Sequence, residues 1–148
     1  MIINMLIGLA VMVFCLFIQA LLVAMSARFY TRHTHLALSP SFTTTVVLIG
    51  GVMMMLVAGN FLQIFIWAGL YLFLGEFESA SVAIYHSAVN FSTLGYGDIV
   101  MSERHRILGP RQAVIGVLMI GVSTAVTMTA FQNALRLMHQ ARQNKPQE

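Results

Sequence analysis

The sequence has 148 residues, of which 58% are hydrophobic and 9% are charged, and its mean hydropathy is +0.81. Because a soluble domain usually carries about 25% charged residues, this composition excludes a disordered chain, a disulfide-rich secreted module and an ordinary cytosolic enzyme. The net charge of +3 comes from eight basic and five acidic residues. The basic residues are scattered between apolar segments, so no nucleic acid partner is expected. The single cysteine, Cys15, is expected to be a small buried apolar residue. The sequence predicts a membrane protein.

The first charge-free interval, residues 1–27, predicts an N-terminal transmembrane helix, because a spanning helix needs ~20 apolar residues. The small residues at 24–27 are weakly similar to a signal-peptide cleavage site. However, no Lys or Arg precedes the apolar run, and the run exceeds the roughly 7–15 residues of a signal peptide's apolar region. We therefore expect this helix to be retained and to be followed by a cytoplasmic linker at 28–41.

The second charge-free interval predicts an outer helix at 42–74, which begins shortly after Pro40. This helix would be roughly 50 Å long, so it must tilt, bend or project from a bilayer core about 30 Å thick. Trp67 and Tyr71, near its outer end, fit an interfacial aromatic belt. The last interval predicts an inner helix at 110–138, with Pro110 at its first position, followed by a short cytoplasmic tail at 139–148.

The third charge-free interval is too short and too polar to cross a membrane. A helix at 79–91 would span only about 18 Å, and it leads into a Gly-rich stretch at 92–98 that does not favour a helix. Non-helical backbone at membrane depth is tolerated only where protein buries it or where it lines a watery cavity. The interval therefore predicts a re-entrant segment, with a half-helix entering the membrane and an extended strand returning.

The distribution of basic residues predicts the orientation. One side of the membrane receives five basic residues: Arg28, Arg32, Arg136, Arg142 and Lys145. The other side receives three basic and four acidic residues: Arg104, Arg106, Arg111, Glu76, Glu78, Asp98 and Glu103. The positive-inside rule then places the C-terminus in the cytoplasm and the re-entrant segment and N-terminus outside.

The strand at 93–97 has glycine at alternate positions, Gly95 and Gly97. Neighbouring carbonyls of an ordinary strand point to opposite sides, so aiming them at one axis requires left-handed conformations at alternate residues, which glycine adopts easily. Such a strand can offer a ladder of carbonyl oxygens, with the Thr93 hydroxyl, in place of an ion's water shell. Because one strand cannot surround an ion, several copies must meet on an axis.

At residues 91–98, the sequence Phe-Ser-Thr-Leu-Gly-Tyr-Gly-Asp resembles the selectivity filter of the potassium channels, with Leu94 where Val or Ile is commoner. The resemblance covers a pore domain at 42–138 and leaves out residues 1–27. It implies an all-α membrane protein with three transmembrane helices, a re-entrant pore helix and an extended selectivity filter. It also implies a homotetramer in the plasma or bacterial inner membrane that conducts K⁺ passively. No catalysis is expected, and no cofactor besides the permeant K⁺.

The resemblance also implies roles for single residues. The filter would be Thr93, Leu94, Gly95, Tyr96 and Gly97, with K⁺ at the carbonyls of the first four. Tyr96 would point away from the axis, and Asp98 would lie at the outer mouth. Val89 stands where many relatives carry an acidic residue that pairs with the equivalent of Asp98. The pore helix must therefore support the filter in another way, through Tyr85 or Asn90.

The inner helix carries a candidate gating hinge at Gly121, with Gly116 as a competing position. Either glycine could instead serve close helix packing, which small residues often permit in membranes. Thr129 and Asn133 fall near the stripe of Gly121, so they are candidates to line the pore, although hydrogen bonding between helices is an equal alternative. The sequence assigns no gating stimulus, because no Arg-rich voltage-sensing helix is present.

Two other functions fit the same sequence: a weakly selective monovalent cation channel, and an accessory membrane subunit with a vestigial pore loop. Among the histidines, His86 is the candidate pH sensor, against the alternative of an ordinary solvated or interfacial side chain. Glu76 and Glu78, just before the half-helix, would either draw cations to the mouth or cap that helix.

Overall fold

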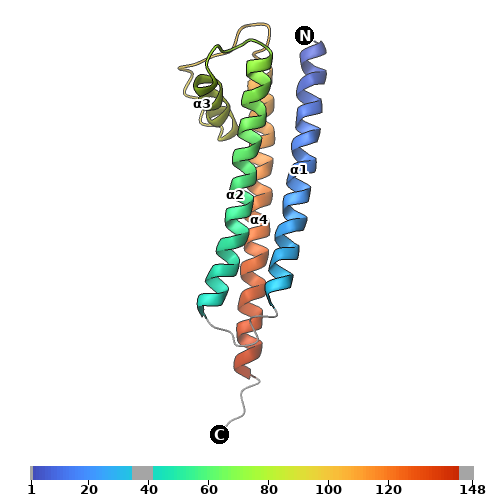
Figure 1. Ribbon diagram of the computed structural model, residues 1–148, viewed down its shortest axis with the longest axis vertical. Coiled ribbons are helices and arrows are strands. Elements are labelled where there is room, and N and C mark those ends of the chain that lie inside the picture. Colours follow the sequence, from blue (N-terminus) through green and yellow to red (C-terminus); the bar gives the residue numbers. More distant parts are fainter. Residues whose placement is uncertain (1, 35–41, 144–148) are drawn as a thin grey trace.

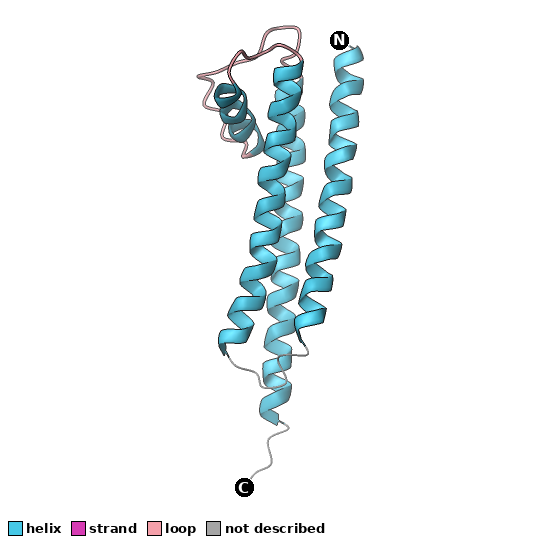
Figure 2. Cartoon of the chain, viewed as in Figure 1, coloured by secondary structure: helices cyan, strands magenta, loops and turns pink. Residues whose placement is uncertain are grey.

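A computed structural model describes residues 2–34 and 42–143. These residues form four helices: α1 (Ile2–Thr34), α2 (Phe42–Phe73), α3 (Ala80–Phe91) and α4 (Leu108–Gln143) (Figure 1). No β-strand paired in a sheet occurs within those two ranges, and residues 93–97, which we call the strand below, are a non-helical segment drawn as a loop (Figure 2). The chain is therefore an all-α protein, as its sequence predicts.

Three of the helices are long and apolar enough to cross a membrane, over Met5–His33, Thr43–Phe73 and Leu108–Met138. Many of their large apolar side chains face outward, among them Phe17 and Met54, each 71% exposed. A helix satisfies its own backbone hydrogen bonds, so these faces can meet hydrocarbon without cost. The prediction of a membrane protein with three spans is confirmed.

The bounds of α1 and α4 differ from the expected ones. Both helices are longer than expected, because no residue at the expected boundary stops the helix. α1 continues to Thr34, seven residues past position 27, so residues 28–34 are helical rather than part of a linker. This segment contains neither Gly nor Pro, and its basic residues complement the negative end of the helix dipole. α4 begins at Leu108 and ends at Gln143, so Pro110 lies in its first turn, where proline is tolerated. Residues 35–41 and 144–148 of the expected linker and tail lie outside the described residues.

α1, α2 and α4 lie side by side along most of their length, and α3 packs against α2 and α4 near one end (Figure 1). The end of α2 and the start of α4 are both at that end, together with the start of α1, whereas the end of α4 is at the opposite end. The segment between α2 and α4 therefore enters and leaves on one side, which is the re-entrant arrangement that the sequence predicts.

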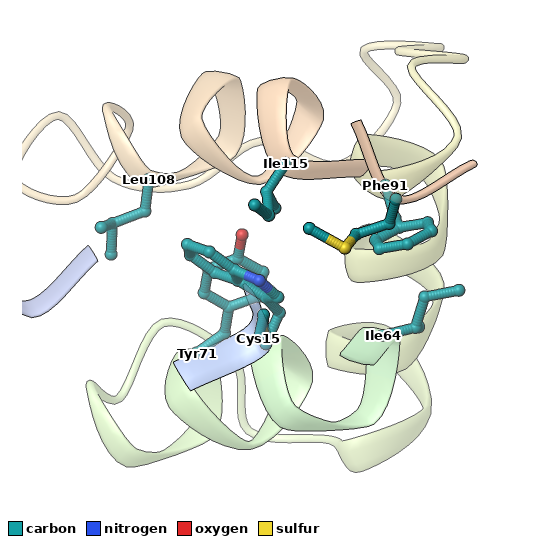
Figure 3. Packing of buried hydrophobic residues seen from close by; sticks show 8 residues of the cluster. Cys15, Ile64, Tyr71, Phe91, Leu108 and Ile115 are labelled. Carbon is teal, nitrogen blue, oxygen red and sulfur yellow. The ribbon is translucent and has the colours of Figure 1, made fainter. Parts of the chain in front are cut away.

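The core joins all four helices. Its buried apolar cluster comprises Cys15, Ile64, Trp67, Tyr71, Phe91, Leu108, Ile115 and Met119 (Figure 3). Cys15 is fully buried, as expected. The assignment of Trp67 and Tyr71 to an interfacial belt is wrong, because both side chains are fully buried between the helices.

Glycines bring α1 close to α2. A Cβ atom at Gly59 would lie 2.2 Å from the Leu22 side chain, and one at Gly51 would lie 2.8 Å from Phe29. Small residues at such contacts let helix backbones approach each other and gain packing energy in a membrane. α1 is therefore an integral part of the helix bundle.

Candidate functional site

The strand that follows α3 alternates in handedness. φ is +59° at Thr93, +58° at Gly95 and +75° at Gly97. The sequence predicts this conformation for the two glycines, whereas Thr93 adopts it despite a β-branched side chain that disfavours it. Among the described residues, Thr93 is the only non-glycine with positive φ. An alternating strand of this kind allows successive carbonyls to face one side, which is the geometry that a cation-binding ladder requires.

The start of the strand is anchored to the last turn of α3. The Thr93 amide donates to the Asn90 carbonyl at 3.0 Å, and the Leu94 amide donates to the Val89 carbonyl at 3.0 Å. The side chains of Leu94 and Tyr96 are 54% and 67% exposed on the single chain. Two large side chains of the strand are therefore uncovered on the single chain.

Asp98, directly after the strand, is bound to α3. The Tyr85 hydroxyl donates a hydrogen bond to Asp98 Oδ2 at 2.7 Å. This bond holds the pKa of Asp98 below its ordinary value, because it stabilises the ionised carboxylate. Of the two residues expected to support the filter, Tyr85 is the one that contacts Asp98.

Asn90 has a different partner. Its Nδ2 lies 2.9 Å from His86 Nε2, one turn earlier in α3. His86 is 7% exposed, and its ring packs against Tyr71 and Phe77, with centroid separations of 5.7 and 5.1 Å. The interpretation of His86 as a solvated side chain is wrong, since it belongs to the packing between α2 and α3.

A buried chain of hydrogen bonds connects α2, α4 and α3. The Tyr71 hydroxyl donates to Gln112 Oε1 at 2.6 Å, Gln112 Nε2 donates to Ser87 Oγ at 2.6 Å, and Ser87 Oγ donates to the Ile64 carbonyl at 2.7 Å. All three side chains are fully buried. Sequence reasoning missed this chain. The available signal was a glutamine at the edge of a long apolar helix, because polar groups at membrane depth need partners.

Glu76 joins the loop before α3 to the loop before α4. The amide and hydroxyl of Ser102 donate to its carboxylate at 2.7 and 2.6 Å, and His105 Nδ1 contacts the same group. Burial opposes ionisation of Glu76, but the bonds from Ser102 and His105 outweigh it, so its pKa lies below the ordinary value. Glu76 thus neither caps α3, whose N-cap Ser79 has no side-chain cap bond, nor points free at the mouth. Glu78 is exposed.

The two candidate hinge glycines of α4 have different surroundings. A Cβ atom at Gly116 would lie 2.1 Å from the Phe91 carbonyl oxygen, so this glycine is needed for contact between α4 and α3. A Cβ atom at Gly121 would meet nothing within 4 Å. Close packing against α3 therefore explains why position 116 is a glycine. Gly121 stays the predicted hinge. Thr129 and Asn133 are both exposed on the single chain, and their place on the pore stays a prediction.

No group of three or more His, Cys, Asp or Glu side chains in the described part of the chain could hold a metal ion. The carbonyls of residues 93–96 and the Thr93 hydroxyl stay predicted as the oxygen donors for a cation. Hard monovalent cations bind such oxygen ligands, and rings of backbone carbonyls are an established way to select among them.

Comparison with known proteins agrees with this geometry. A family described as "Ion channel" matches residues 41–133, which include α2, α3, the strand and most of α4. No curated protein and no solved structure matches the chain. α1 lies outside the matched range. Because the match covers more than half of the sequence, the chain belongs to the ion channel family, with a pore domain of the two-helix potassium-channel type.

Proposed function

We propose that four copies of this chain form a channel that conducts K⁺ passively across the cell membrane. The observation that carries the proposal is the alternation of positive φ at Thr93, Gly95 and Gly97, on a strand that follows a short helix between two candidate membrane spans. A single strand offers oxygen ligands from one side only. Replacing an ion's water shell requires ligands all round, so four strands must meet on one axis.

Within this pore, the carbonyls of Thr93, Leu94, Gly95 and Tyr96 bind K⁺, and the Thr93 hydroxyl closes the innermost site. α3 ends next to the strand, and the partial negative charge at its C-terminus favours a cation beneath the filter. The exposure of Tyr96 supports the proposal, because a neighbouring copy would cover such a side chain.

The positive-inside rule supports an outward-facing filter with a cytoplasmic C-terminus. Asp98 then lies at the outer mouth, where its negative charge raises the local concentration of cations. The bond from Tyr85 keeps this carboxylate ionised and fixed to α3.

Purified protein in liposomes tests the function. With a K⁺ gradient across the membrane, we expect Rb⁺ uptake that an excess of external K⁺ suppresses and external Na⁺ does not. Protein-free liposomes measure the leak, and a K⁺ ionophore added at the end measures the total capacity. Equal permeation of Na⁺ would favour a weakly selective channel, and no uptake by correctly assembled protein would favour an accessory subunit.

A further inference from the structure

A buried polar junction joins α1 to the middle of the pore domain. Gln19 of α1 is 3% exposed, and its Oε1 accepts a bond from Gln63 Nε2 of α2 at 2.9 Å. Its Nε2 donates to Ser123 Oγ of α4 at 3.2 Å. Gln19 thus bridges α2 and α4. An amide buried at membrane depth is costly unless it is bonded, so this bridge favours the helix arrangement in which both bonds form.

The part of α4 that Gln19 contacts has features that favour helix bending. Over residues 119–129, which we call the hydroxyl segment, four side chains bond back to carbonyls one turn earlier: Ser123, Thr124, Thr127 and Thr129. Such bonds compete with the backbone ladder and often bend helices. Gly121 lies in the same segment and is free of steric contact. The hydroxyl segment therefore combines two features that lower the cost of bending a helix.

The junction also contains hydrogen-bond acceptors that have no partner. Asn60 Nδ2 lies 3.4 Å from Ser123 Oγ, and the Asn60 Oδ1 and Gln63 Oε1 atoms are buried with no hydrogen-bond partner. These two acceptors lie on one face of α2, since residues three apart are neighbours on a helix. Ser123 gives its proton to the Met119 carbonyl. If α4 shifts, the unpartnered acceptors offer other places for that proton, so the network has more than one bonded arrangement.

We propose that α1 restrains the hydroxyl segment through Gln19 and thereby sets the open probability of the pore. The inference rests on the proposed channel function and gives α1, which lies outside the matched family range, a role in gating. Gln19 is a positioning residue, because it acts on the pore through Ser123. The bond exists in only one arrangement of α4, so it shifts the balance between arrangements by its own free energy.

Two single variants and their combination test the restraint. Gln19→Met keeps the shape of the side chain and removes its hydrogen bonds, and Ser123→Ala removes the partner on α4. In single-channel recordings, each should change the open probability at least about threefold, as expected for loss of one net hydrogen bond, and both in the same direction. Unit conductance and the K⁺/Na⁺ ratio should stay at the wild-type values. The double variant should change the open probability no further than Gln19→Met alone.

Two controls separate the bridge from other effects. Thr124→Ala also removes a bond within the hydroxyl segment, but its partner is Ile120 and not α1, so its effect should add to that of Gln19→Met. Leu21→Ala shortens an α1 side chain that is 61% exposed, and it should leave the open probability unchanged. Additive effects of Gln19→Met and Ser123→Ala would overturn the proposal.

Hydrogen–deuterium exchange tests the restraint without conduction. In Gln19→Met, we expect the amides of residues 121–129 to exchange at least about threefold faster than in the wild type, and in Leu21→Ala at the wild-type rate. Unchanged exchange in Gln19→Met would refute the restraint. A wild-type protein that takes up no Rb⁺ would instead refute the channel function, whatever the exchange rates are.

Discussion

At the scale of single residues, the proposed filter depends on backbone conformations that most side chains oppose. Thr93, Gly95 and Gly97 all have positive φ, and only the glycines adopt it without strain. Thr93 accepts the strain while its amide is bonded to the end of α3. A strained residue that its surroundings hold in place is typical of a functional site.

Gly95→Ala should abolish Rb⁺ uptake or its selectivity. A Cβ atom there would meet nothing within 4 Å in this chain, so the cost of roughly 1–2 kcal/mol comes from the left-handed backbone alone. Gly69→Ala is the matched control, because Gly69 lies in α2 with equally open space and a helical backbone. Normal selective uptake by Gly95→Ala would refute the assignment of the filter.

Tyr85→Phe should make conduction more sensitive to acid. The Tyr85 hydroxyl lowers the pKa of Asp98, so its removal raises that pKa toward the ordinary value. With a lowered pKa, the contribution of ionised Asp98 is present at neutral pH and is lost as the pH falls through the folded-state value. We therefore expect Rb⁺ uptake to fall at a higher pH in Tyr85→Phe than in the wild type.

The measurement is Rb⁺ uptake followed from neutral pH into the acidic range. Asp98→Asn, which has no carboxylate, should lack the acidic step that belongs to this residue. Identical midpoints in Tyr85→Phe and the wild type would show that the bond between Tyr85 and Asp98 does not support conduction.

At the scale of elements, α3 is held in place by contacts from both neighbouring helices. Ser87 connects α3 to α2 and α4 through the buried chain of hydrogen bonds that contains Gln112. Gly116 lets the backbone of α4 contact Phe91, the last residue of α3. The strand begins where α3 ends, so these contacts set the position of the strand that we propose as the filter.

Gly116→Ala should destabilise the protein by about 1–3 kcal/mol, the usual cost of overpacking a tight contact. The new Cβ atom would lie 2.1 Å from the Phe91 carbonyl oxygen, so α4 and α3 must separate. The measurement is the thermal unfolding midpoint in detergent. Gly121→Ala meets no atom and should keep or raise this midpoint, while it changes the open probability if Gly121 is the hinge. Equal midpoints of Gly116→Ala and the wild type would contradict the packing role.

At the scale of the whole molecule, the single chain leaves the strand that we propose as the filter uncovered. Tyr96 and Leu94 are exposed beside the strand, and one strand cannot enclose a cation. α1, in contrast, is bonded within the chain to α2 and α4, so the chain meets lipid as a bundle of three spanning helices.

The conducting form should contain four chains. Native mass spectrometry of protein released from detergent should give a complex of four times the chain mass of 16.3 kDa. Cross-linking in liposomes that also take up Rb⁺ is an independent check, with Gly116→Ala as a variant expected to yield less of the complex. A dominant monomer or dimer in conducting liposomes would contradict the proposed pore.

The sequence by itself determined the three spans, the re-entrant segment and the left-handed glycines of the strand. Each of these follows from local properties: the spacing of charges along the chain, and the absence of a Cβ atom at Gly95 and Gly97. A bilayer enforces them strongly, because it tolerates neither long polar segments nor unbonded backbone.

Only the tertiary structure decided which polar side chains meet. The bonds from Tyr85 to Asp98, from Ser102 to Glu76 and from Gln19 to Ser123 join residues between 13 and 104 positions apart. A polar residue in an apolar helix signals that it needs a partner, but the identity of the partner depends on helix packing. Packing likewise separated Gly116 from Gly121, which look alike in the sequence, since only one of them faces the end of α3.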